Sequence, residues 1–398
     1  MDDLLTHLYN ACDPLYPAEP EQYIDLTAVR GGGLFVQDTI REIGVSRLNP
    51  HADGKFIRKL FTGHTGCGKS SELKHLEGEL KSKTPTFPHE RYFPIYIDML
   101  DHVDRNDASL PEIMMAVVTE VAHKLREEEK IELRNTYIEK RWEEIKKLLL
   151  GDVELKKVDL SLWGAKAEIN LKLADPSSRE KVRNALLPHM TRLIEEINLV
   201  LEKARAELRS RTPLDGGRTY EDIVLLLDNM EKIQRVSGRE MGEASDRALF
   251  LEGASQLTGL NSQTLYTVPL SLVRAVGPEL SNAYGCPAFV LPNVKTETRG
   301  AHAKGEPGRH CLIELLKLRT SHHSFDQVFT PEAVDFLLDY CGGHVRQLMR
   351  SVRQACLRVE HAPITLDAAE QAVAQSVHEY SSIRPHQWQL MAELERSE

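Results

Sequence analysis

An eight-residue segment carries the strongest signal in this sequence, and it reads Gly63-His64-Thr65-Gly66-Cys67-Gly68-Lys69-Ser70. It follows residues 56–62, a largely apolar run typical of a buried strand, and it precedes residues 71–76, whose apolar positions have helical spacing. The segment matches the Gly-x-x-x-x-Gly-Lys-Ser/Thr phosphate-binding loop in full. Strand, loop and helix therefore occur in the order that this motif requires.

The residue types of this segment suit the binding of phosphate groups. Glycines permit backbone conformations closed to other residues, so successive N–H groups can point at phosphate oxygens above the positive N-terminus of the next helix. We expect Lys69 to reach the β- and γ-phosphates and Ser70 to offer its hydroxyl to Mg²⁺. Cys67 is interpreted as a small filler rather than a nucleophile. The residues expected to contact the phosphates are Gly63, His64, Thr65, Gly66, Cys67, Gly68, Lys69, Ser70 and Ser71.

A second signal is a pair of acids after an apolar run, within residues 221–231. The five apolar residues 223–227 are typical of a central parallel strand, and Asp228 follows at the end where ligands bind in open α/β sheets. Asp228 would hold Mg²⁺ through water. Glu231 is close enough to orient or deprotonate an attacking water, although a solvated loop acid is the alternative for it. Asp222, before the strand, is interpreted as a cap or a surface charge.

The remaining pattern is that of an α/β protein with an insertion. Further strands are predicted at residues 92–98, 263–271 and 288–292, and a helix over residues 110–125. Residues 126–175 are expected to be an insertion in the core. It would hold a charged helix and a β-hairpin whose apolar face is covered either by flanking helices or by another subunit.

Two places outside the main motifs are candidates for nucleotide contacts. Thr267 or Ser271, near the end of a predicted strand, could contact the γ-phosphate or its water, and an ordinary strand-end hydrogen bond is the alternative. The chain from about residue 308 is predicted to be helical, and Gly342-Gly343-His344-Val345-Arg346 opens one of these helices. Arg346, at that helix start, could reach phosphates across a domain cleft.

Composition and charge exclude several classes of protein. Acidic residues outnumber basic ones and give a net charge of -10, which excludes a wholly basic nucleic-acid surface. No apolar run approaches the ~18 residues of a membrane span, and the N-terminus lacks the basic start of a secretory signal. The six cysteines form no Cys-x-x-Cys pair, which argues against a zinc site or a disulfide framework. We therefore expect a cytoplasmic protein with reduced thiols and no membrane partner.

The chain resembles the AAA+ and STAND group of P-loop ATPases over about residues 20–375. The resemblance rests on the phosphate loop, the acids at residues 228–231, the Tyr-Thr-Val-Pro-Leu-Ser strand and the Gly-Gly-His-Val-Arg helix start. The three-residue gap between the acids is similar to the STAND pattern, whereas Asn229 departs from the small residue usual there. The resemblance implies an α/β P-loop sandwich of three layers, with a parallel sheet of strand order 5-1-4-3-2 and a C-terminal helical lid.

The resemblance also implies roles for individual residues. Residues 24–31 look like the segment that covers the adenine, with a plain N-terminal surface segment as the alternative. Arg274 and Arg299 are both candidates for an arginine finger. The other implied roles are Lys69 and Ser70 as the Walker A pair, Asp228 and Glu231 as the Walker B pair, Thr267 as the first sensor and Arg346 as the second.

The expected organisation follows from these roles. Residues 1–50 would cover the nucleotide, residues 51–307 would form the ATPase core with its insertion, residues 308–380 the lid, and residues 381–398 a tail. ATP is expected over GTP, because the sequence lacks an Asn-Lys-x-Asp motif for reading guanine.

The leading interpretation is a Mg²⁺-dependent switch ATPase, in which ATP closes the lid and the closed form oligomerises or binds a partner until hydrolysis resets it. Bacterial STAND-like ATPases often act with separately encoded effectors in defence against phages, so the resemblance implies an effector partner and an antiviral role. The alternatives are a DNA-associated AAA+ ATPase that acts as a loader or transposition regulator, and a nucleotide-holding scaffold without turnover. A nucleic-acid partner is not favoured, because the residues after the lid are too few for the winged helix of origin-recognition ATPases.

Overall fold

The computed structural model describes most of the chain and divides it into two units. The described residues are 3–31, 33–47, 56–83, 91–131, 180, 183–184, 186–233, 243–298, 303–304, 306–320, 324–377 and 385–397. The charged helix and the hairpin expected within the insertion lie outside them, and so does Arg299. One unit, the sheet unit, comprises Phe35–Thr62 and Glu72–Val290, and the other, the helical unit, comprises Met1–Leu34, Gly63–Ser71 and Leu291–Glu398. The four domain ranges expected from the sequence stay predictions.

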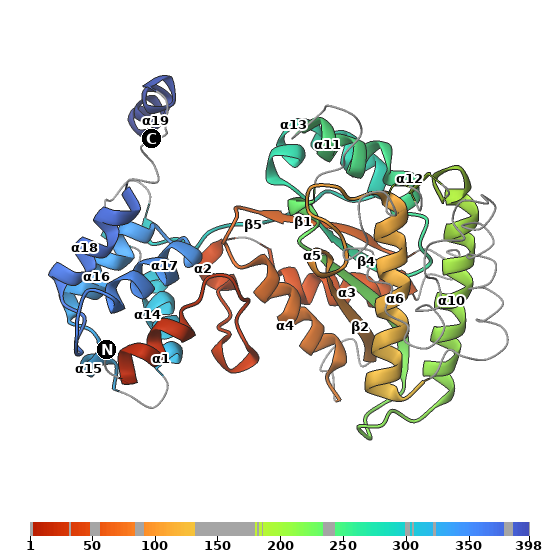
Figure 1. Cartoon of the computed structure of the whole chain (residues 1–398), viewed down its shortest axis with the longest axis horizontal. Coiled ribbons are helices and arrows are strands. Elements are labelled where there is room, and N and C mark those ends of the chain that lie inside the picture. The colour runs from red at the N-terminus through yellow and green to blue at the C-terminus, as the bar shows by residue number, and fades with distance from the viewer. Residues whose placement is uncertain are drawn as a thin grey trace. The chain divides into compact units, whose positions relative to one another are not determined.

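A five-stranded sheet is the centre of the sheet unit (Figure 1). The strand order is β2-β3-β4-β1-β5, and the pairs β2–β3, β3–β4 and β4–β1 are parallel. This confirms the α/β fold class and the order 5-1-4-3-2. The strands are β1 (Arg58–Gly63), β2 (Arg91–Asp98), β3 (Tyr220–Asp228), β4 (Gln263–Thr267) and β5 (Phe289–Leu291). In a parallel sheet the carboxyl ends of the strands share one edge, so the ends of β2, β3 and β4 lie there together.

The strand predicted over residues 263–271 is shorter than expected. β4 ends at Thr267, and helix α13 (Leu270–Tyr284) begins three residues later. Pro269 lies between them at the N-cap position, where its missing N–H cannot extend a sheet ladder and its fixed φ suits the entry to a helix. Ser271 consequently lies exposed in the first turn of a helix rather than at a strand end.

Helices cover the sheet, and their apolar faces make the core. The predicted helix over residues 110–125 is α6 (Leu110–Glu129), and it packs against β2 and α10, which also contacts β3 (Figure 1). The first half of α6, residues 110–119, is buried on all sides, and Val121 and Leu125 continue one buried face at helical spacing in the second half. The other helical elements of the sheet unit are α3 (Phe35–Arg47), α4 (Lys69–Lys81, from Glu72 on), α5 (Met99–His102), η4 (Leu187–His189), α10 (Met190–Ser210), η5 (Met230–Lys232), α11 (Glu243–Arg247), η6 (Ala248–Glu252) and α12 (Ala254–Leu257).

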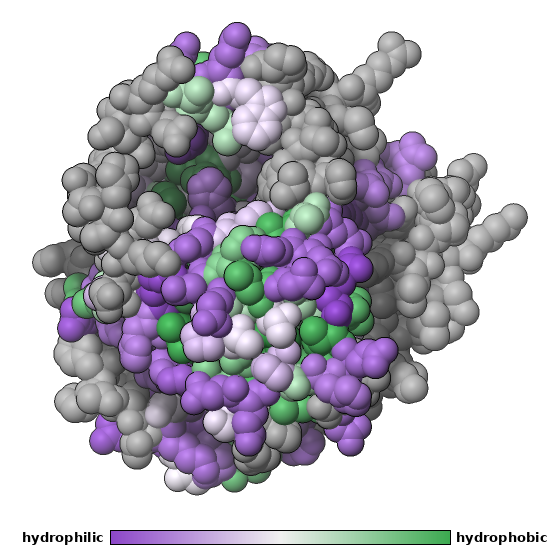
Figure 2. Space-filling view, turned by 90° about the vertical axis from the view of Figure 1, so that its left-hand side faces the viewer, coloured by the Kyte–Doolittle hydropathy of each residue, from purple (hydrophilic) through white to green (hydrophobic). Residues whose placement is uncertain are grey.

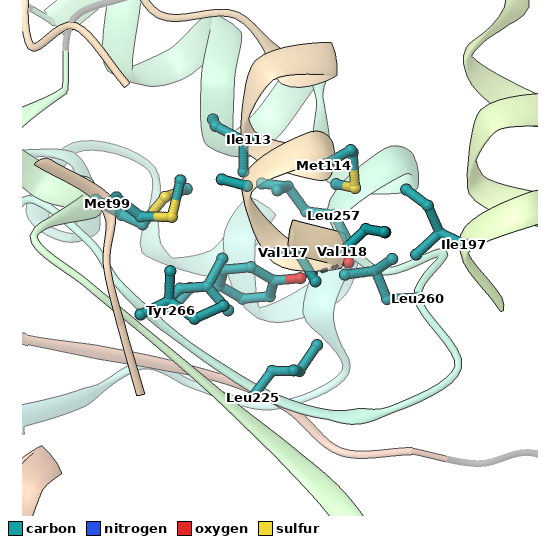
Figure 3. Close-up of a cluster of buried hydrophobic side chains, with 14 of the residues drawn as sticks. Met99, Ile113, Met114, Val117, Val118, Ile197, Leu225, Leu257, Leu260 and Tyr266 are labelled. Atoms are coloured by element: carbon teal, nitrogen blue, oxygen red, sulfur yellow. Dashed lines mark hydrogen bonds between the residues drawn. The ribbon is translucent and has the colours of Figure 1, made fainter. Parts of the chain in front are cut away.

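Tyr266 shows how the core accommodates a polar atom. Its ring lies among side chains of α6, β3 and the segment after α12, and its hydroxyl donates a hydrogen bond of 2.6 Å to the carbonyl of Leu257 (Figure 3). Burial raises the pKa of this phenol, so it stays a donor. A buried hydroxyl with its partner in place costs little, whereas an unpaired one would cost about 1–3 kcal/mol.

Asp222 corrects one interpretation made from the sequence. It is buried rather than a surface charge, and it is ion-paired with Arg205 of α10. It also accepts a hydrogen bond of 2.8 Å from the N–H of Ile223. The acid at the start of β3 therefore anchors a helix to the sheet.

The helical unit has a core of its own. Its apolar residues come from the N-terminal segment and the C-terminal helices, with Leu8, Leu316, Leu337, Leu348 and Val352 fully buried. On the face that Figure 2 presents, hydrophobic areas lie between hydrophilic ones, as on the surface of most folded domains. Among the described residues, no helix is long and apolar enough to cross a membrane.

The elements of the helical unit agree with the prediction of a helical C-terminal region. They are α1 (Asp3–Ala11), η1 (Pro20–Gln22), α2 (Thr27–Arg30), β6 (Glu297–Thr298), β7 (Ala303–Lys304), α14 (Glu306–Thr320), α15 (Phe325–Val328), α16 (Pro331–Cys341), α17 (Val345–Cys356), α18 (Leu366–Val377) and α19 (Pro385–Ser397).

Candidate functional site

The phosphate loop has backbone conformations that require glycine. β1 ends at Gly63, α4 begins at Lys69, and between them Gly66 and Gly68 have φ of 88° and 104°. A side chain at Gly63 would place its Cβ 2.7 Å from the carbonyl oxygen of Leu291 and 2.8 Å from Sγ of Cys67. The loop thus combines two left-handed glycines with one closely packed glycine, directly before a helix N-terminus.

Lys69 lies across its own loop. The side chain is 6% exposed, and Nζ donates hydrogen bonds to the carbonyls of Gly63 at 3.1 Å and His64 at 3.4 Å. Ser70 is half-buried at the first turn of α4. Cys67 is fully buried, and burial raises the pKa of its thiol, which disfavours the reactive thiolate. An ammonium and a helix N-terminus at one loop create a local positive potential suited to an anion.

The start of α17 contacts the phosphate loop within the helical unit. The backbone N–H of Arg346 donates a hydrogen bond of 3.1 Å to the carbonyl of Gly66. A Cβ on Gly66 would lie 2.5 Å from Cβ of Arg346 and 2.7 Å from Cε1 of His344. From the sequence we expected the side chain of Arg346 to contact a phosphate. That contact stays a prediction. What the structure shows is a backbone contact that needs glycine in the loop.

His344 joins the loop to the helix through both ring nitrogens. Nδ1 accepts a hydrogen bond of 3.1 Å from the N–H of Gln347, which caps α17, and Nε2 lies 2.7 Å from the carbonyl of Thr65. Because Nδ1 accepts and a carbonyl can only accept, the proton must be on Nε2, and the ring is neutral. Burial lowers the pKa of His344, which favours the neutral form.

The N-terminal segment brings a positive charge to the loop. Leu26 and Val29 are part of the core of the helical unit, so residues 24–31 are not a plain surface segment. Arg30 is buried and donates a hydrogen bond of 2.6 Å to the carbonyl of Pro292, and its Nη2 lies 3.3 Å from where a Cβ on Gly68 would be. A guanidinium beside the loop adds to its positive potential. The covering of an adenine by this segment stays a prediction.

In the sheet unit, Asp228 is held by two donors. The residue is fully buried at the end of β3. Its Oδ2 accepts a hydrogen bond of 2.6 Å from the hydroxyl of Tyr96, and its Oδ1 accepts one of 2.7 Å from the N–H of Asn229. Two donors on one carboxylate fix the plane of its oxygens.

The chain turns sharply after Asp228. Asn229 has φ of 60° and donates a hydrogen bond of 2.8 Å from Nδ2 to Oδ2 of Asp98. The N–H of Met230 donates one of 2.9 Å to the hydroxyl of Thr267. Glu231 is half-buried in η5, the short helix that this turn begins. The turn of residues 228–231, which we call the acidic turn, therefore contacts both β2 and β4.

Thr267 makes ordinary strand-end hydrogen bonds to the acidic turn, which was the alternative interpretation of this residue. Its hydroxyl is fully buried at the end of β4, accepts from Met230 and donates to the carbonyl of Leu227 at 3.4 Å. These are strand-end hydrogen bonds. A contact of Thr267 with a γ-phosphate stays a prediction, and Ser271 and Arg274 are exposed on α13.

Sequence reasoning missed the roles of Tyr96, Asp98, Arg30 and His344 at these places. Tyr96 and Asp98 occupy the end of β2, and the rule that parallel strands end at one edge could have found them. His344 stands in a motif that was singled out for its arginine. Arg30 stands in the segment expected to cover the adenine, but its approach to the loop depends on tertiary packing and was not predicted. Among the described residues, no group of three or more His, Cys, Asp or Glu side chains is arranged to hold a metal alone.

Solved structures include chains similar to this one over about nine tenths of its length. A structure of Drosophila ORC bound to DNA is 11% identical, with a TM-score of 0.44 over 93% of this chain and 66% of that chain. A crystal structure of CDC6P from Pyrobaculum aerophilum is 14% identical, with a TM-score of 0.38 over 90% of this chain and 65% of that chain. The chain spans less than two thirds of either structure. No protein-family model and no curated protein sequence matches it.

Proposed function

We propose that this chain binds ATP with Mg²⁺ and hydrolyses it. The observation that carries the proposal is the loop of residues 63–70, which combines glycines at positive φ, a lysine across the loop and a helix N-terminus. Glycines at positive φ allow backbone N–H groups to face a phosphate, and the lysine and the helix N-terminus supply positive charge. A side chain on Gly66 would not fit beside Arg346 and His344, so the contact between the loop and α17 requires glycine there.

The proposal gives each residue a task. Lys69 binds the β- and γ-phosphates. The sequence motifs assign Mg²⁺ binding, directly or through water, to the hydroxyl of Ser70 and to the carboxylate of Asp228. When bound, Mg²⁺ neutralises the charge on the phosphate oxygens. Glu231 accepts a proton from the attacking water. Thr267 supports the acidic turn through Met230.

The same proposal extends to a switch. Loop and α17 share two hydrogen bonds within the helical unit, at Gly66 and Thr65. A phosphate that shifts the loop backbone would alter these contacts, and the start of α17 would respond. We propose that the ATP state assembles or engages a protein partner, and hydrolysis reverses this. The antiviral role is supported by the sequence resemblance alone.

The test of ATP binding and turnover compares two lysines of one helix. Lys69→Ala should lower the affinity for a fluorescent ATP analogue by roughly 100-fold or more, because a charge-assisted contact to phosphate is lost. Lys81→Ala, whose lysine pairs with Glu128 at the far end of α4, should bind like the wild type. Equal affinities of the two variants would contradict the assignment of the loop.

Turnover is tested at the proposed base. Glu231→Gln should keep ATP affinity while phosphate release slows by ~100-fold or more. Light scattering of Glu231→Gln with ATP and Mg²⁺ then tests the switch, since a mass equal to that of the nucleotide-free protein would contradict assembly as its output. Tight binding of duplex DNA at physiological salt would favour the DNA-associated alternative instead.

A further inference from the structure

Asn229 occupies a conformation that costs free energy for any residue except glycine. Its φ of 60° and ψ of 14° lie in the left-handed region, where Asn is tolerated better than most residues. It follows Asp228 directly and precedes the short helix that carries Glu231. A glycine would make the same turn without strain, so the side chain of Asn229 calls for an explanation.

That side chain is anchored to the neighbouring strand. Nδ2 of Asn229 donates a hydrogen bond of 2.8 Å to Oδ2 of Asp98, and Asp98 lies opposite Asp228 in the register of β2 and β3. The other oxygen of Asp98 accepts a hydrogen bond of 3.0 Å from the N–H of Leu100, which caps α5. The carboxylate is therefore fixed on one side by a helix start and is itself a firm anchor for the amide on the other.

The chain beyond Asn229 is fixed from the opposite side. Met230 donates to Thr267 on β4, and Lys232 donates a hydrogen bond of 3.0 Å back to the carbonyl of Asn229. Glu231 lies between these two contacts. The turn that carries Glu231 is thus tied to β2 through the side chain of Asn229 and to β4 through Met230 and Thr267, which leaves its backbone little freedom.

We propose that Asn229 and Asp98 form a positioning pair for Glu231, an inference that rests on the proposed ATP hydrolysis. The pair acts through the backbone of the turn and takes no part in the chemistry itself. It fixes the direction in which the chain leaves β3, and so the place where the Glu231 carboxylate meets the attacking water. Displacement of a catalytic group by about 1 Å can cost up to ~100-fold in rate, which gives the pair a measurable effect on turnover.

The decisive variant is Asn229→Gly, because glycine keeps the turn and removes only the anchor. It should lower kcat by roughly 10- to 100-fold while KM and the affinity for ATP stay within about twofold of the wild type. Asp98→Ala should have the same signature. The double variant should be no slower than the slower single variant, because the two residues act as one unit.

The matched control is Asn198→Ala in the same unit. Asn198 also makes two hydrogen bonds, to the carbonyl of Gly259 at 2.9 Å and from the N–H of Asn261 at 2.7 Å, and it belongs to α10. Its loss should lower the melting temperature and leave kcat at the wild-type value. A kcat of Asn229→Gly equal to that of the wild type, or effects of the two single variants on kcat that multiply in the double variant, would overturn the pairing.

The wild-type measurement separates this inference from the proposed function. If the wild type hydrolyses ATP and both Asn229→Gly and Asp98→Ala do so at the same rate, the positioning pair is rejected. The proposed hydrolysis then stands. Absence of turnover in the wild type, with ATP bound, rejects both hydrolysis and the pair. Should Asn229→Gly fail to fold, Asp98→Ala reads out the same contact from the other strand, and wild-type kcat in that variant overturns the inference.

Discussion

The phosphate loop and the acidic turn both hold backbone in the left-handed region, but they do so by different means. The loop uses glycines at 66 and 68, whose conformations need no support from side chains. The acidic turn uses Asn229, which is held by Asp98 on one neighbouring strand while Met230 is held by Thr267 on another. The loop is thus defined by adjacent residues, whereas the turn is defined by the assembled sheet.

Among the changes that test this comparison, the largest effect is expected where the loop excludes side chains. Gly66→Ala would place a methyl group 2.5 Å from Cβ of Arg346 at a φ of 88°. Strain of about 1–3 kcal/mol at such a position corresponds to a roughly 5- to 150-fold loss of ATP affinity. Isothermal titration with ATP measures this. Gly78→Ala is the control, because its Cβ would meet nothing within 4 Å, and equal affinities of the two variants would break the comparison.

The next effect concerns the carboxylate of the acidic turn. Tyr96→Phe removes a 2.6 Å hydrogen bond to buried Asp228 while keeping the ring in place. Hydrogen bonds to charged groups contribute about 1.5–3 kcal/mol, so the Mg²⁺ concentration for half-maximal turnover should rise by roughly tenfold. Titration of the rate with Mg²⁺ measures this shift, and an unchanged midpoint would show that Tyr96 is only a packing residue.

A smaller effect is expected at the contact between the loop and α17. His344→Asn keeps an acceptor for the N–H of Gln347 but is too short to donate to Thr65. If the bond holds the loop in the shape that binds phosphate, loss of about 1 kcal/mol predicts a roughly fivefold loss of ATP affinity, with a small fall in the melting temperature. His344→Ala should also lower the melting temperature, because the cap of α17 is lost. The same affinity in His344→Asn and the wild type would contradict the link.

The smallest effect on activity is expected at an ion pair remote from both regions. Arg91 donates to the carboxylate of Asp215 and lowers its pKa from 3.8 to about 2. Because the folded-state pKa is lowered, the pair stabilises the fold above pH ~4, and this stabilisation is lost as the pH falls toward 2. Chemical unfolding of Asp215→Asn should differ from the wild type at pH 6 and converge with it near pH 2, with kcat unchanged. A constant difference across this range would contradict the assigned pKa.

The contrast between the two regions explains which features could be predicted from the sequence and which could not. Residues 56–76 contain strand, loop and helix signals in series, and the apolar run at 223–227 predicts β3, because all of these depend on adjacent residues. The end of β4 was placed too late, since Pro269 continues the apolar pattern but starts a helix. The anchor of Asn229 was not predictable, because Asp98 is 131 positions away and meets it only through strand pairing.

The position of β2 has a consequence for local stability. β2 forms one edge of the sheet in the described part of the chain, and Tyr96 and Asp98 are at its end. Edge strands open more readily than central ones, and opening here would release Asp228 and Asn229 together while β1 stays paired on both sides. Amide hydrogen exchange in β2 should therefore be faster than in β1 and should slow when Mg²⁺ and ATP bind. The proposed capacity for hydrolysis would then be lost by fraying of one strand before the capacity to bind nucleotide.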